Sequence, residues 1–370
     1  MSPTQGKKSN VEVAGRGKSG IVTYLLITTT NHKYLVAKEL NIRKLFRFTS
    51  YTTGSKGNIK VYRAKGGEGH YDSKYTRNSY SILASGYFAI EDLGKNVVIY
   101  GGGLGHGVGM PQFTAHDLAK NYGYNYKQIL KRNYPNTKLK NMYSISGIGK
   151  IIKVGITCSG GYLDHSRVTL ISNGKLKIKG AGFKIDVPRK QRVVIINHGN
   201  KLWVSVNGHH RVKTVNPLHV SAGGYYITLE GVRKAHTLSP RYRGEMLIMP
   251  SRTNSRKIRV INEVRIEDYL KQVVPSEMPE SFDIEALKAQ AVAARTYALS
   301  DYLKGRYVRD GFHVKDTVES QVYNNQFENS KATKAIEATS GKVLLYNDKP
   351  IDAKYFSTSS GFTEASNYVW

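Results

Sequence analysis

Short apolar runs bounded by Gly, Asn or His turns predict strands over much of the chain. Near the N-terminus they fall at 11–13, 21–28 and 33–36, and a strand at 97–100 leads directly into a glycine-rich loop. Between 150 and 266 nearly every segment has a strand pattern, most clearly 151–156, 167–171, 175–179, 193–197, 202–206 and 258–264. Their spacing, with turns such as Ser-Asn-Gly and Val-Asn-Gly, is typical of a meander or barrel.

A helical period appears at several places among these strands. The longest helix is predicted from Ile284 to about Gly305, with Asp283 as N-cap. Apolar residues, mostly alanine, step by three and four and form one stripe: Ile284, Leu287, Ala291, Ala294 and Ala298. Shorter helices are predicted at 114–119, 126–131 and 329–339, and strands at 342–346 and 352–356. The pattern predicts an α+β fold, strand-rich and meander- or barrel-like, in which one long alanine-striped helix carries the catalytic region.

Composition narrows the class of protein. The 370 residues, 40% of them hydrophobic, are enough for one large domain or two ordinary ones. Lys and Arg number 56 against 27 acidic residues, and the net charge of +29 points to an anionic partner: nucleic acid, a membrane surface or an acidic cell wall. A single cysteine, Cys158, excludes a disulfide framework. No apolar run approaches a membrane span, and the N-terminus lacks the apolar region of a signal peptide.

A carboxylate in an unusual setting is the first candidate for chemistry. Glu277 stands between two prolines in the segment 273–279, Val-Val-Pro-Ser-Glu-Met-Pro, just before the long helix. Prolines favour a rigid turn, and apolar surroundings favour the protonated carboxyl. Such a group suits general acid–base catalysis. An exposed loop glutamate is the alternative explanation.

The glycine-rich loop at 101–110 is the second candidate, because His106 lies between Gly105 and Gly107. The spacing fits neither a dinucleotide fingerprint nor a P-loop. Glycine lets backbone approach another group closely, so we expect the imidazole to be presented rather than buried. A tight structural turn is the alternative.

A hydroxyl-rich turn follows the last predicted strand. Ser357, Thr358 and Ser359 offer hydroxyls and amides that can hydrogen-bond a polar ligand such as a sugar. The Gly-x-Ser-x-Gly pattern of a serine nucleophile is absent, and an ordinary polar turn is the alternative. The histidines are dispersed, without His-Glu-x-x-His or Cys-x-x-Cys, so we expect no metal site and no cofactor.

Together these motifs resemble the stage II sporulation protein D family, which includes proteins described as amidase enhancers. The resemblance rests on NEVRIEDYL at 262–270, VVPSEMP at 273–279, EALKAQAVAARTYA at 285–298, QVY at 321–323 and YFSTSSGFTE at 355–364. LGHGVGM at 104–110 and GRGKSG at 15–20 are similar to the family's ending.

The order of these segments differs from the family's, in which the acidic motif comes first and GHGVGM last. The resemblance therefore implies a circularly permuted arrangement. Residues 1–140 correspond to the family's C-terminal part, 150–262 to its β-rich N-terminal part and 263–370 to its catalytic segment, with 1–140 and 263–370 forming one fold. The tail of one copy joined to the head of the next, or a cut through a circular sequence, are alternatives. A permuted domain that folds alone would hold residues 1 and 370 on the same side.

The resemblance implies a lytic transglycosylase, a lyase-type enzyme that cleaves MurNAc–GlcNAc bonds of peptidoglycan, preferably in peptide-stripped strands. Glu277 would act as acid and then base and leave 1,6-anhydro products, without the second carboxylate of a hydrolase. The residues expected to contact substrate or brace the site are Arg295, Tyr297, Ser357, Thr358, Ser359, His106, Gly105 and Gly107. Arg295 is expected to pair with Glu277 or to contact an acidic sugar substituent.

The partners implied are peptidoglycan glycan strands and a cell-wall amidase. The location implied is extracytoplasmic, secreted or cell-wall associated, with any leader or anchor outside this sequence. A non-catalytic wall-binding protein that stimulates an amidase is the alternative function. We expect no nucleic-acid partner, because no recognised motif or dense basic cluster accompanies the charge. Some family members bind zinc through Cys and His before the QVY segment, but 313–320 holds His313 and no Cys, so zinc is not expected.

Overall fold

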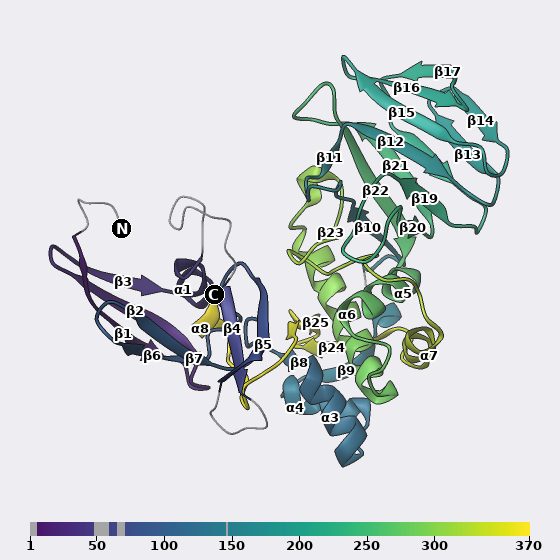
Figure 1. The fold of residues 1–370 in the computed structure, drawn as a ribbon. Coiled ribbons are helices and arrows are strands. Elements are labelled where there is room, and N and C mark those ends of the chain that lie inside the picture. Colours follow the sequence, from purple (N-terminus) through teal and green to yellow (C-terminus); the bar gives the residue numbers. More distant parts are fainter. Residues whose placement is uncertain (1–5, 48–58, 65–70, 146) are drawn as a thin grey trace. The chain divides into compact units, whose positions relative to one another are not determined.

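A computed structural model describes residues 6–47, 59–64, 71–145 and 147–370 (Figure 1). The chain divides into two compact units. Unit 1 combines Met1–Leu118 with Lys354–Trp370, and unit 2 comprises Ala119–Ala353. The last segment of the chain therefore packs with the first. The grouping of 1–140 with 263–370 as one fold stays a prediction.

Unit 1 is built on an antiparallel sheet in the order β1–β2–β3. Its core gathers Val22, Leu25 and Ile27 of β2 with Ile42 of α1 and Phe88 of β6. The elements of this unit are β1 (Lys8–Arg16), β2 (Val22–Thr29), β3 (Lys33–Ala37), α1 (Glu39–Leu45), β4 (Ile59–Ala64), β5 (Tyr71–Tyr80), β6 (Phe88–Asp92), β7 (Val97–Gly101), β8 (Met110–Pro111), the first part of α3 (Gln112–Tyr122), β26 (Tyr355–Phe356) and α8 (Ser366–Val369). The pairs β4–β5 and β6–β7 are antiparallel, and β26 runs parallel to β8.

The β-rich part of unit 2 forms two sheets. The first holds β14 (Phe183–Val187), β13 (Leu176–Gly180), β18 (Leu218–Ser221), β21 (Glu245–Pro250), β22 (Ile258–Arg265), β10 (Ile151–Gly155) and β23 (Val314–Lys315), with β11 (Asp164–His165) paired to β22. The second has the order β17 (His209–Thr214), β16 (Lys201–Val206), β15 (Val193–His198), β12 (Arg167–Ile171), β19 (Ile227–Glu230) and β20 (Arg241–Tyr242). The two sheets contact each other through β16 and β21.

Neither of these sheets closes into a barrel within the described residues. The barrel-like alternative is therefore wrong, and the strand-rich α+β class is confirmed. Strand spacing predicts which strands are antiparallel neighbours, but closure depends on strand tilt and stagger, which the sequence pattern does not encode.

The long helix α6 (Ile284–Lys304) forms the centre of the helical part of unit 2 and contacts α4, α5, α7 and β24. Asp283 caps it by accepting a hydrogen bond from the backbone N–H of Glu285 at 2.8 Å, and Gly305 ends it in a left-handed conformation. Of residues 286–301, all except Lys288 are buried. Buried residues therefore lie on all sides of the helix and not only along the alanine stripe, because other elements cover its remaining faces.

The other elements of unit 2 are α4 (Tyr126–Asn133), β9 (Lys138–Asn141), the 3₁₀ turn η2 (Met142–Ser144), α5 (Ile266–Glu277), the 3₁₀ turn η3 (Val308–Asp310), α7 (Ser330–Ala338), β24 (Lys342–Tyr346) and β25 (Lys349–Pro350). Within the described part of the chain, no helix has both the length and the hydropathy of a bilayer-spanning helix.

The segment around Glu277 differs from its prediction. The prolines predict a rigid turn, but α5 extends through Pro275 and ends at Glu277. Proline removes one N–H and with it the bond to the carbonyl of Lys271. The helical pattern resumes at once, since the N–H of Met278 donates to the carbonyl of Val274 at 2.9 Å. The helix therefore tolerates the proline in its last turn.

Candidate functional site

Glu277 lines a cleft of about 560 Å³ at the C-terminal end of α5. The side chain is half-buried. The walls of the cleft come from the end of α5, from the segment before α7, and from one loop of the β-rich part: Pro275, Ser276, Met278, Pro279, Glu280, Gln326, Phe327, Glu328, Asn329 and His236. Glu277 is thus accessible to a ligand while part of its surface is covered by protein.

The position of the Glu277 carboxylate is fixed by a backbone donor. The N–H of Val322 donates to Oε1 of Glu277 at 2.6 Å. Val322 is the middle residue of the QVY motif, and the residues on either side of it, Gln321 and Tyr323, are buried. The side chains of Gln321 and Tyr323 therefore point into the protein, and the N–H of Val322 points at the Glu277 carboxylate.

Gln321 and Tyr323 anchor that motif to three elements. Nε2 of Gln321 donates to the carbonyl of Ala294 in α6 at 3.2 Å, and the hydroxyl of Tyr269 donates to Oε1 of Gln321 at 3.1 Å. The hydroxyl of Tyr323 donates to Oδ1 of Asn262 in β22 at 2.8 Å. Burial raises the pKa of Tyr269 and of Tyr323 well above the usual value, so both hydroxyls remain donors at neutral pH.

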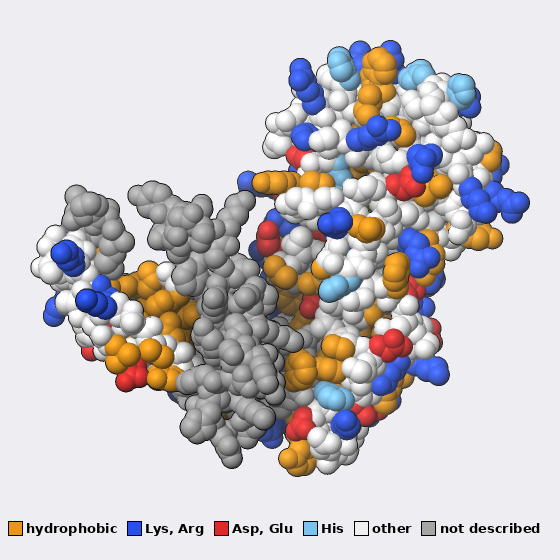
Figure 2. All heavy atoms as spheres, in the orientation of Figure 1, with side chains coloured by type: hydrophobic (Ala, Val, Ile, Leu, Met, Phe, Trp, Pro, Cys, Tyr) orange, Lys and Arg blue, Asp and Glu red, His pale blue; other side chains and the backbone are white. Residues whose placement is uncertain are grey.

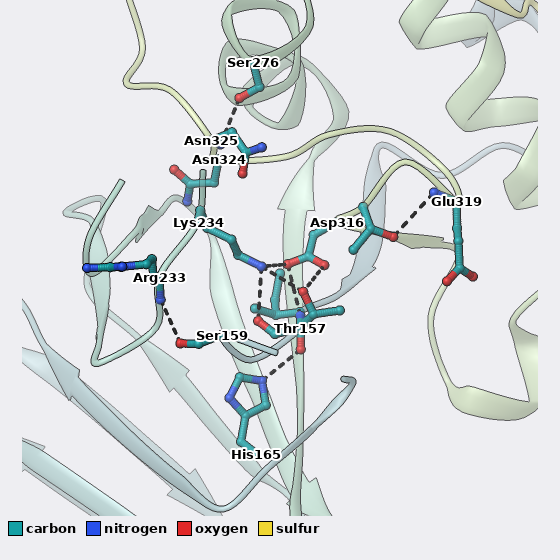
Figure 3. Close-up of polar contacts among 12 residues, drawn as sticks. Thr157, Ser159, His165, Arg233, Lys234, Ser276, Asp316, Glu319, Asn324 and Asn325 are labelled. Atoms are coloured by element: carbon teal, nitrogen blue, oxygen red, sulfur yellow. Dashed lines mark hydrogen bonds and ion pairs between the residues drawn. The ribbon is translucent and has the colours of Figure 1, made fainter. Parts of the chain in front are cut away.

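Ser276, next to Glu277, makes a second clamp on the same segment. Its Oγ donates to the carbonyl of Gln272 at 2.6 Å and accepts from the N–H groups of Asn325 at 3.0 Å and Gln326 at 3.2 Å. Figure 3 shows the contact between Ser276 and Asn325. The serine and glutamate of the VVPSEMP motif therefore both bind backbone N–H groups of 322–326.

A buried ion pair holds the start of this segment (Figure 3). The Asp316 carboxylate is fully buried and pairs with Nζ of Lys234. It also accepts hydrogen bonds from the N–H of Thr157 at 3.0 Å and from the Thr157 hydroxyl at 2.9 Å. The backbone carbonyl of Asp316 accepts from the N–H of Tyr323 at 3.4 Å. This network links the segment after β10, the loop at 231–238 and the segment that presents Val322 to Glu277.

The neighbouring carboxylates stand in different settings from Glu277. Glu328 is held by Arg243 through two hydrogen bonds of 2.8 Å. Glu280 is exposed. Glu285 accepts from Lys288 at 2.6 Å and from the N–H of Tyr126 at 2.8 Å. Of the acidic residues that line the cleft, Glu328 is engaged by an arginine and Glu280 lies in solvent.

Arg295 does not make the predicted pair with Glu277. Its side chain is fully buried, and its guanidinium donates to both carboxylate oxygens of Glu267, at 2.9 and 2.8 Å, and to the carbonyl of Lys342 at 3.0 Å. A side chain enclosed on all sides is not placed to meet a polymer. Arg295 instead ties α6 to the first turn of α5 and to β24, and so braces the helix that carries Glu277.

Tyr297 is also buried, with 4% of its surface exposed. Burial, followed by the negative charges of Asp301 and Asp352, raises the pKa of its hydroxyl. It belongs to the interior of the α6 packing. The spacing of residues in the sequence places Tyr297 on one face of the helix, but it does not reveal that other parts of the protein cover this face.

Two of the sequence motifs come together within unit 1. Leu104 of the glycine-rich loop and Thr358 of the hydroxyl turn exchange backbone hydrogen bonds of 2.8 and 3.0 Å. Ser357 and Thr358 share a hydrogen bond between their hydroxyls at 3.1 Å, and Oγ of Ser359 accepts from the N–H of Gly361 at 3.3 Å. The three hydroxyl residues are partly exposed.

His106 uses both ring nitrogens inside the protein. Nδ1 accepts from the N–H of Val108 at 3.1 Å, and Nε2 lies 3.1 Å from the carbonyl oxygen of Tyr355. Because Nδ1 accepts, Nε2 carries the hydrogen in this arrangement. The ring lies between Phe356 and Trp370, with centroid distances of 5.5 and 5.0 Å. Backbone groups therefore engage both nitrogens of a partly exposed imidazole, and contact of His106 with a substrate stays a prediction.

Gly105 and Gly107 allow close approach, but to the protein's own rings. Both have positive φ, +114° and +81°. A Cβ on Gly105 would lie 2.8 Å from Cβ of Phe356, and one on Gly107 would lie 2.9 Å from the ring of Tyr87. Neither position accepts a side chain without displacement of its neighbours.

Glu364, the last residue of YFSTSSGFTE, was not among the predicted site residues but contacts the GRGKSG segment. Glu364 is buried, and its Oε2 accepts from both the N–H of Ser19 at 2.9 Å and its hydroxyl at 2.6 Å. A Cβ on Gly17 would stand 2.1 Å from the same oxygen. Glu364 thus explains the glycine and serine of the GRGKSG segment. Ser19 and Glu364 are 345 residues apart in the sequence, so no local pattern signals this contact.

Histidines near acidic groups have other partners. Nδ1 of His313 accepts from the N–H of Lys153 at 3.1 Å, and burial, then the charge of Lys153, lowers the pKa of His313 to about 4. His219, Glu245 and Glu263 bring ligand atoms within 4.8 Å of one another, but Lys153 already pairs with Glu263 at 2.6 Å. Neither arrangement adds support for a metal.

Comparison with known proteins matches part of this chain to one family. Residues 254–346 match the family model SpoIID, stage II sporulation protein. An amidase enhancer of Bacillus subtilis (strain 168) is 50% identical over 101 residues, which cover 27% of this chain and 13% of that protein. Stage II sporulation protein D of the same strain is 35% identical over 161 residues, 39% of this chain and 47% of the relative. The protein of that name from Bacillus amyloliquefaciens is 34% identical over 174 residues, 42% and 51% of the two chains.

The matched segment contains α5, α6, the QVY motif and the cleft-lining residues 275–280. The protein is thus an α+β protein with a family domain built around Glu277. That domain belongs to the stage II sporulation protein D family, as the resemblance implied. The matches span about half or less of the length of these relatives.

Proposed function

We propose that this protein is a peptidoglycan lytic transglycosylase with Glu277 as its catalytic acid and base. The observation that carries the proposal is the setting of Glu277, which faces a cleft of about 560 Å³ while its Oε1 is held by the N–H of Val322. A carboxylate fixed by backbone and open to a ligand on one side suits proton transfer to a bound substrate. Membership in a family linked to sporulation and the cell wall supports a glycan strand as that substrate.

The proposed chemistry uses a single carboxyl group. Protonated Glu277 donates its proton to the oxygen between C1 of MurNAc and O4 of GlcNAc, and the C1–O4 bond breaks. The C6 hydroxyl oxygen of the same MurNAc then bonds to C1 and gives its proton to the Glu277 carboxylate. The products are a free GlcNAc 4-hydroxyl end and a 1,6-anhydro-MurNAc end, and Glu277 is protonated again.

The environment of the cleft supports this route over hydrolysis. A glycoside hydrolase uses a second carboxylate as nucleophile or as base for water. The two other carboxylates of the cleft are Glu328, which Arg243 engages, and the exposed Glu280. The substrate's own C6 hydroxyl removes the need for a second group.

We further propose that the partly exposed hydroxyls of Ser357, Thr358 and Ser359 hydrogen-bond a polar ligand such as a sugar. His106, Gly105 and Gly107 would hold the adjoining loop in shape, and Arg295 and Tyr297 would brace α6. A circularly permuted order of the family's segments and an extracytoplasmic, wall-associated location are parts of the same proposal.

Amidase stimulation is the second candidate function. It is favoured by the 50% identity over 101 residues to a relative named amidase enhancer. In that case the cleft would bind wall glycan without cleaving it, and the partner would be a cell-wall amidase.

Digestion of purified, peptide-stripped glycan strands separates the two functions. Glu277→Gln keeps the shape of the side chain but cannot exchange a proton, so turnover should fall roughly 10²–10⁴-fold while sedimentation with wall sacculi is unchanged. Glu280→Gln removes an exposed carboxylate of the same cleft and should leave turnover near the wild-type rate. Wild-type protein that leaves the strands intact but accelerates an amidase would support the second function.

A further inference from the structure

The second sheet of unit 2 presents an outer face without acidic residues on four adjacent strands. In β12, β15, β16 and β17 there is no Asp or Glu. These strands instead carry four cations, Arg167, Lys201, Arg211 and Lys213. None of the four makes an ion pair within the described part of the chain, whereas Arg192 beside them is paired with Glu230. The positive charge of this face is therefore uncompensated.

Strand register places two of these cations in one row with apolar residues. Arg167 stands opposite Ile196, Ile196 opposite Trp203, and Trp203 opposite Lys213. Residues directly opposite in an antiparallel pair lie on the same face of the sheet. Adjacent strands are about 4.8 Å apart, so the row spans roughly 14 Å from Arg167 to Lys213.

This row lies on the solvent side of the sheet. Alternate residues such as Val168, Ile195 and Val204 point inward and are fully buried, whereas Ile196 in the row is 40% exposed. In Figure 2, Lys, Arg and His side chains surround a hydrophobic strip over β15–β17, in the region that carries these labels in Figure 1. The face combines apolar and cationic side chains without intervening acids.

Trp203 is the aromatic centre of the face. Nζ of Lys213 lies 3.6 Å from its ring centroid, and the rings of His198 and His210 lie 6.0 and 5.8 Å away. The indole N–H is itself buried and has no hydrogen-bond partner among the described residues, so the ring contributes its apolar surface to this face. A β-bulge between Val204 and Ser205 adds Arg211 to the opposing strand. Bulges often re-aim side chains at functional surfaces.

We propose that this face binds a phosphodiester-linked polymer of sugar or polyol units. Lys213, Arg167 and Lys201 meet the phosphates, and an apolar edge of a unit packs on Trp203 and Ile196. Phosphodiesters remain ionised at all physiological pH values and repeat at every unit, which matches four cations spread over β12, β16 and β17. A peptide-stripped glycan strand carries only one carboxylate for each disaccharide. A platform for single-stranded nucleic acid stacks successive bases on several exposed aromatics, whereas this face has one tryptophan, partly covered by Lys213.

The surface is independent of the chemistry proposed for Glu277. Binding would hold the protein on an anionic polymer without use of the cleft at α5. Glu277→Gln should therefore leave polymer binding unchanged, and loss of polymer binding should leave cleavage of short soluble glycan fragments unchanged. The proposal for this face and the proposal for Glu277 can therefore be refuted separately, the first by polymer binding and the second by glycan cleavage.

The test compares two charge-matched triple variants of the full chain. Arg167→Ala, Lys201→Ala and Lys213→Ala remove three cations from the face. Lys177→Ala, Lys179→Ala and Arg189→Ala remove three equally exposed cations from β13 and the loop after β14. The probes are synthetic poly(glycerol phosphate), wall sacculi before and after hydrofluoric acid removes phosphodiesters, and a single-stranded DNA with the same number of phosphates.

The face variant should bind poly(glycerol phosphate) at least about tenfold more weakly, because three exposed ion pairs contribute roughly two- to fivefold each. The control triple should stay within about twofold of wild type, since exposed charges away from the contact are screened. Acid-treated sacculi should lose most binding. If both triple variants lost the same affinity for poly(glycerol phosphate), net charge alone would explain the effect and the proposal would be overturned. Unchanged binding to acid-treated sacculi, or DNA binding as tight and as sensitive to the face variant, would also overturn it.

Discussion

Removal of the Lys234 charge should destabilise the protein more than any single surface change. Lys234→Met keeps most of the side-chain length but leaves the Asp316 carboxylate, which is fully buried, without its cation. Among the described residues, only the N–H and the hydroxyl of Thr157 would still donate to it. Breaking one side of a buried pair costs about 3–5 kcal/mol, out of a total of about 5–15 kcal/mol for a typical domain.

A second substitution, made in the Lys234→Met background, tests whether the unpaired Asp316 charge causes the loss of stability. Asp316→Asn in the Lys234→Met background removes the orphaned charge and should recover most of the lost stability, because replacing both partners is often close to neutral. Lys315→Met is the matched control, since its partner Glu319 is largely exposed and the pair is worth less than about 1 kcal/mol.

Urea unfolding of the wild type and these three variants, followed by tryptophan fluorescence and circular dichroism, measures these differences. Turnover should fall further in Lys234→Met than the folded fraction predicts, because Asp316 begins the segment that donates the Val322 N–H to Glu277. Equal stability losses in Lys234→Met and Lys315→Met would refute the reasoning, as would a double variant no more stable than the single one.

Three further predictions concern other parts of the chain. Stability should fall as the pH drops from about 6.5 toward 4, because His313, whose pKa is lowered to about 4, is protonated more readily in the unfolded chain; His313→Gln should reduce this loss in urea titrations at pH 7 and 5, and an identical pH dependence would contradict it. Gly17→Ala should cost about 1–3 kcal/mol, because its Cβ would stand 2.1 Å from the Glu364 carboxylate; Gly149→Ala, whose nearest neighbour would be 3.8 Å away, should be nearly neutral, and equal melting shifts would count against the contact. Arg295→Met should lower stability by about 1–3 kcal/mol, because the partly buried Glu267 would lose the guanidinium and keep the N–H of Gly341 as donor; a variant that melts like wild type but no longer binds glycan would restore Arg295 as a substrate contact.

Local patterns predicted the regular elements well. The strand at 167–171 and the strand at 342–346 match β12 and β24, and α6 begins and ends at its predicted caps, Asp283 and Gly305. These features depend on side-chain alternation and on capping chemistry, which are local properties of the sequence. Helix α5 was missed because Pro275 is unfavourable inside helices, and the one lost hydrogen bond is tolerated in its last turn.

Contacts between distant residues could not be predicted from these patterns. Lys234 and Asp316 are 82 residues apart, and neither has a distinctive sequence setting. The burial of Arg295 depends on Glu267 and on the packing around α6, and the two acceptors of His106 depend on how 104–110 lies against 355–358. Glu277 could be singled out because its motif is local, but its donor, the N–H of Val322, is 45 residues away.

The most direct test of the account is the mass of the products released from purified, peptide-stripped glycan strands by the wild-type protein and by Glu277→Gln. We expect 1,6-anhydro-MurNAc ends from the wild type, each lighter by one water than a reducing end, and almost no product from the variant. Reducing ends from the wild type, or anhydro products from Glu277→Gln at the wild-type rate, would contradict it.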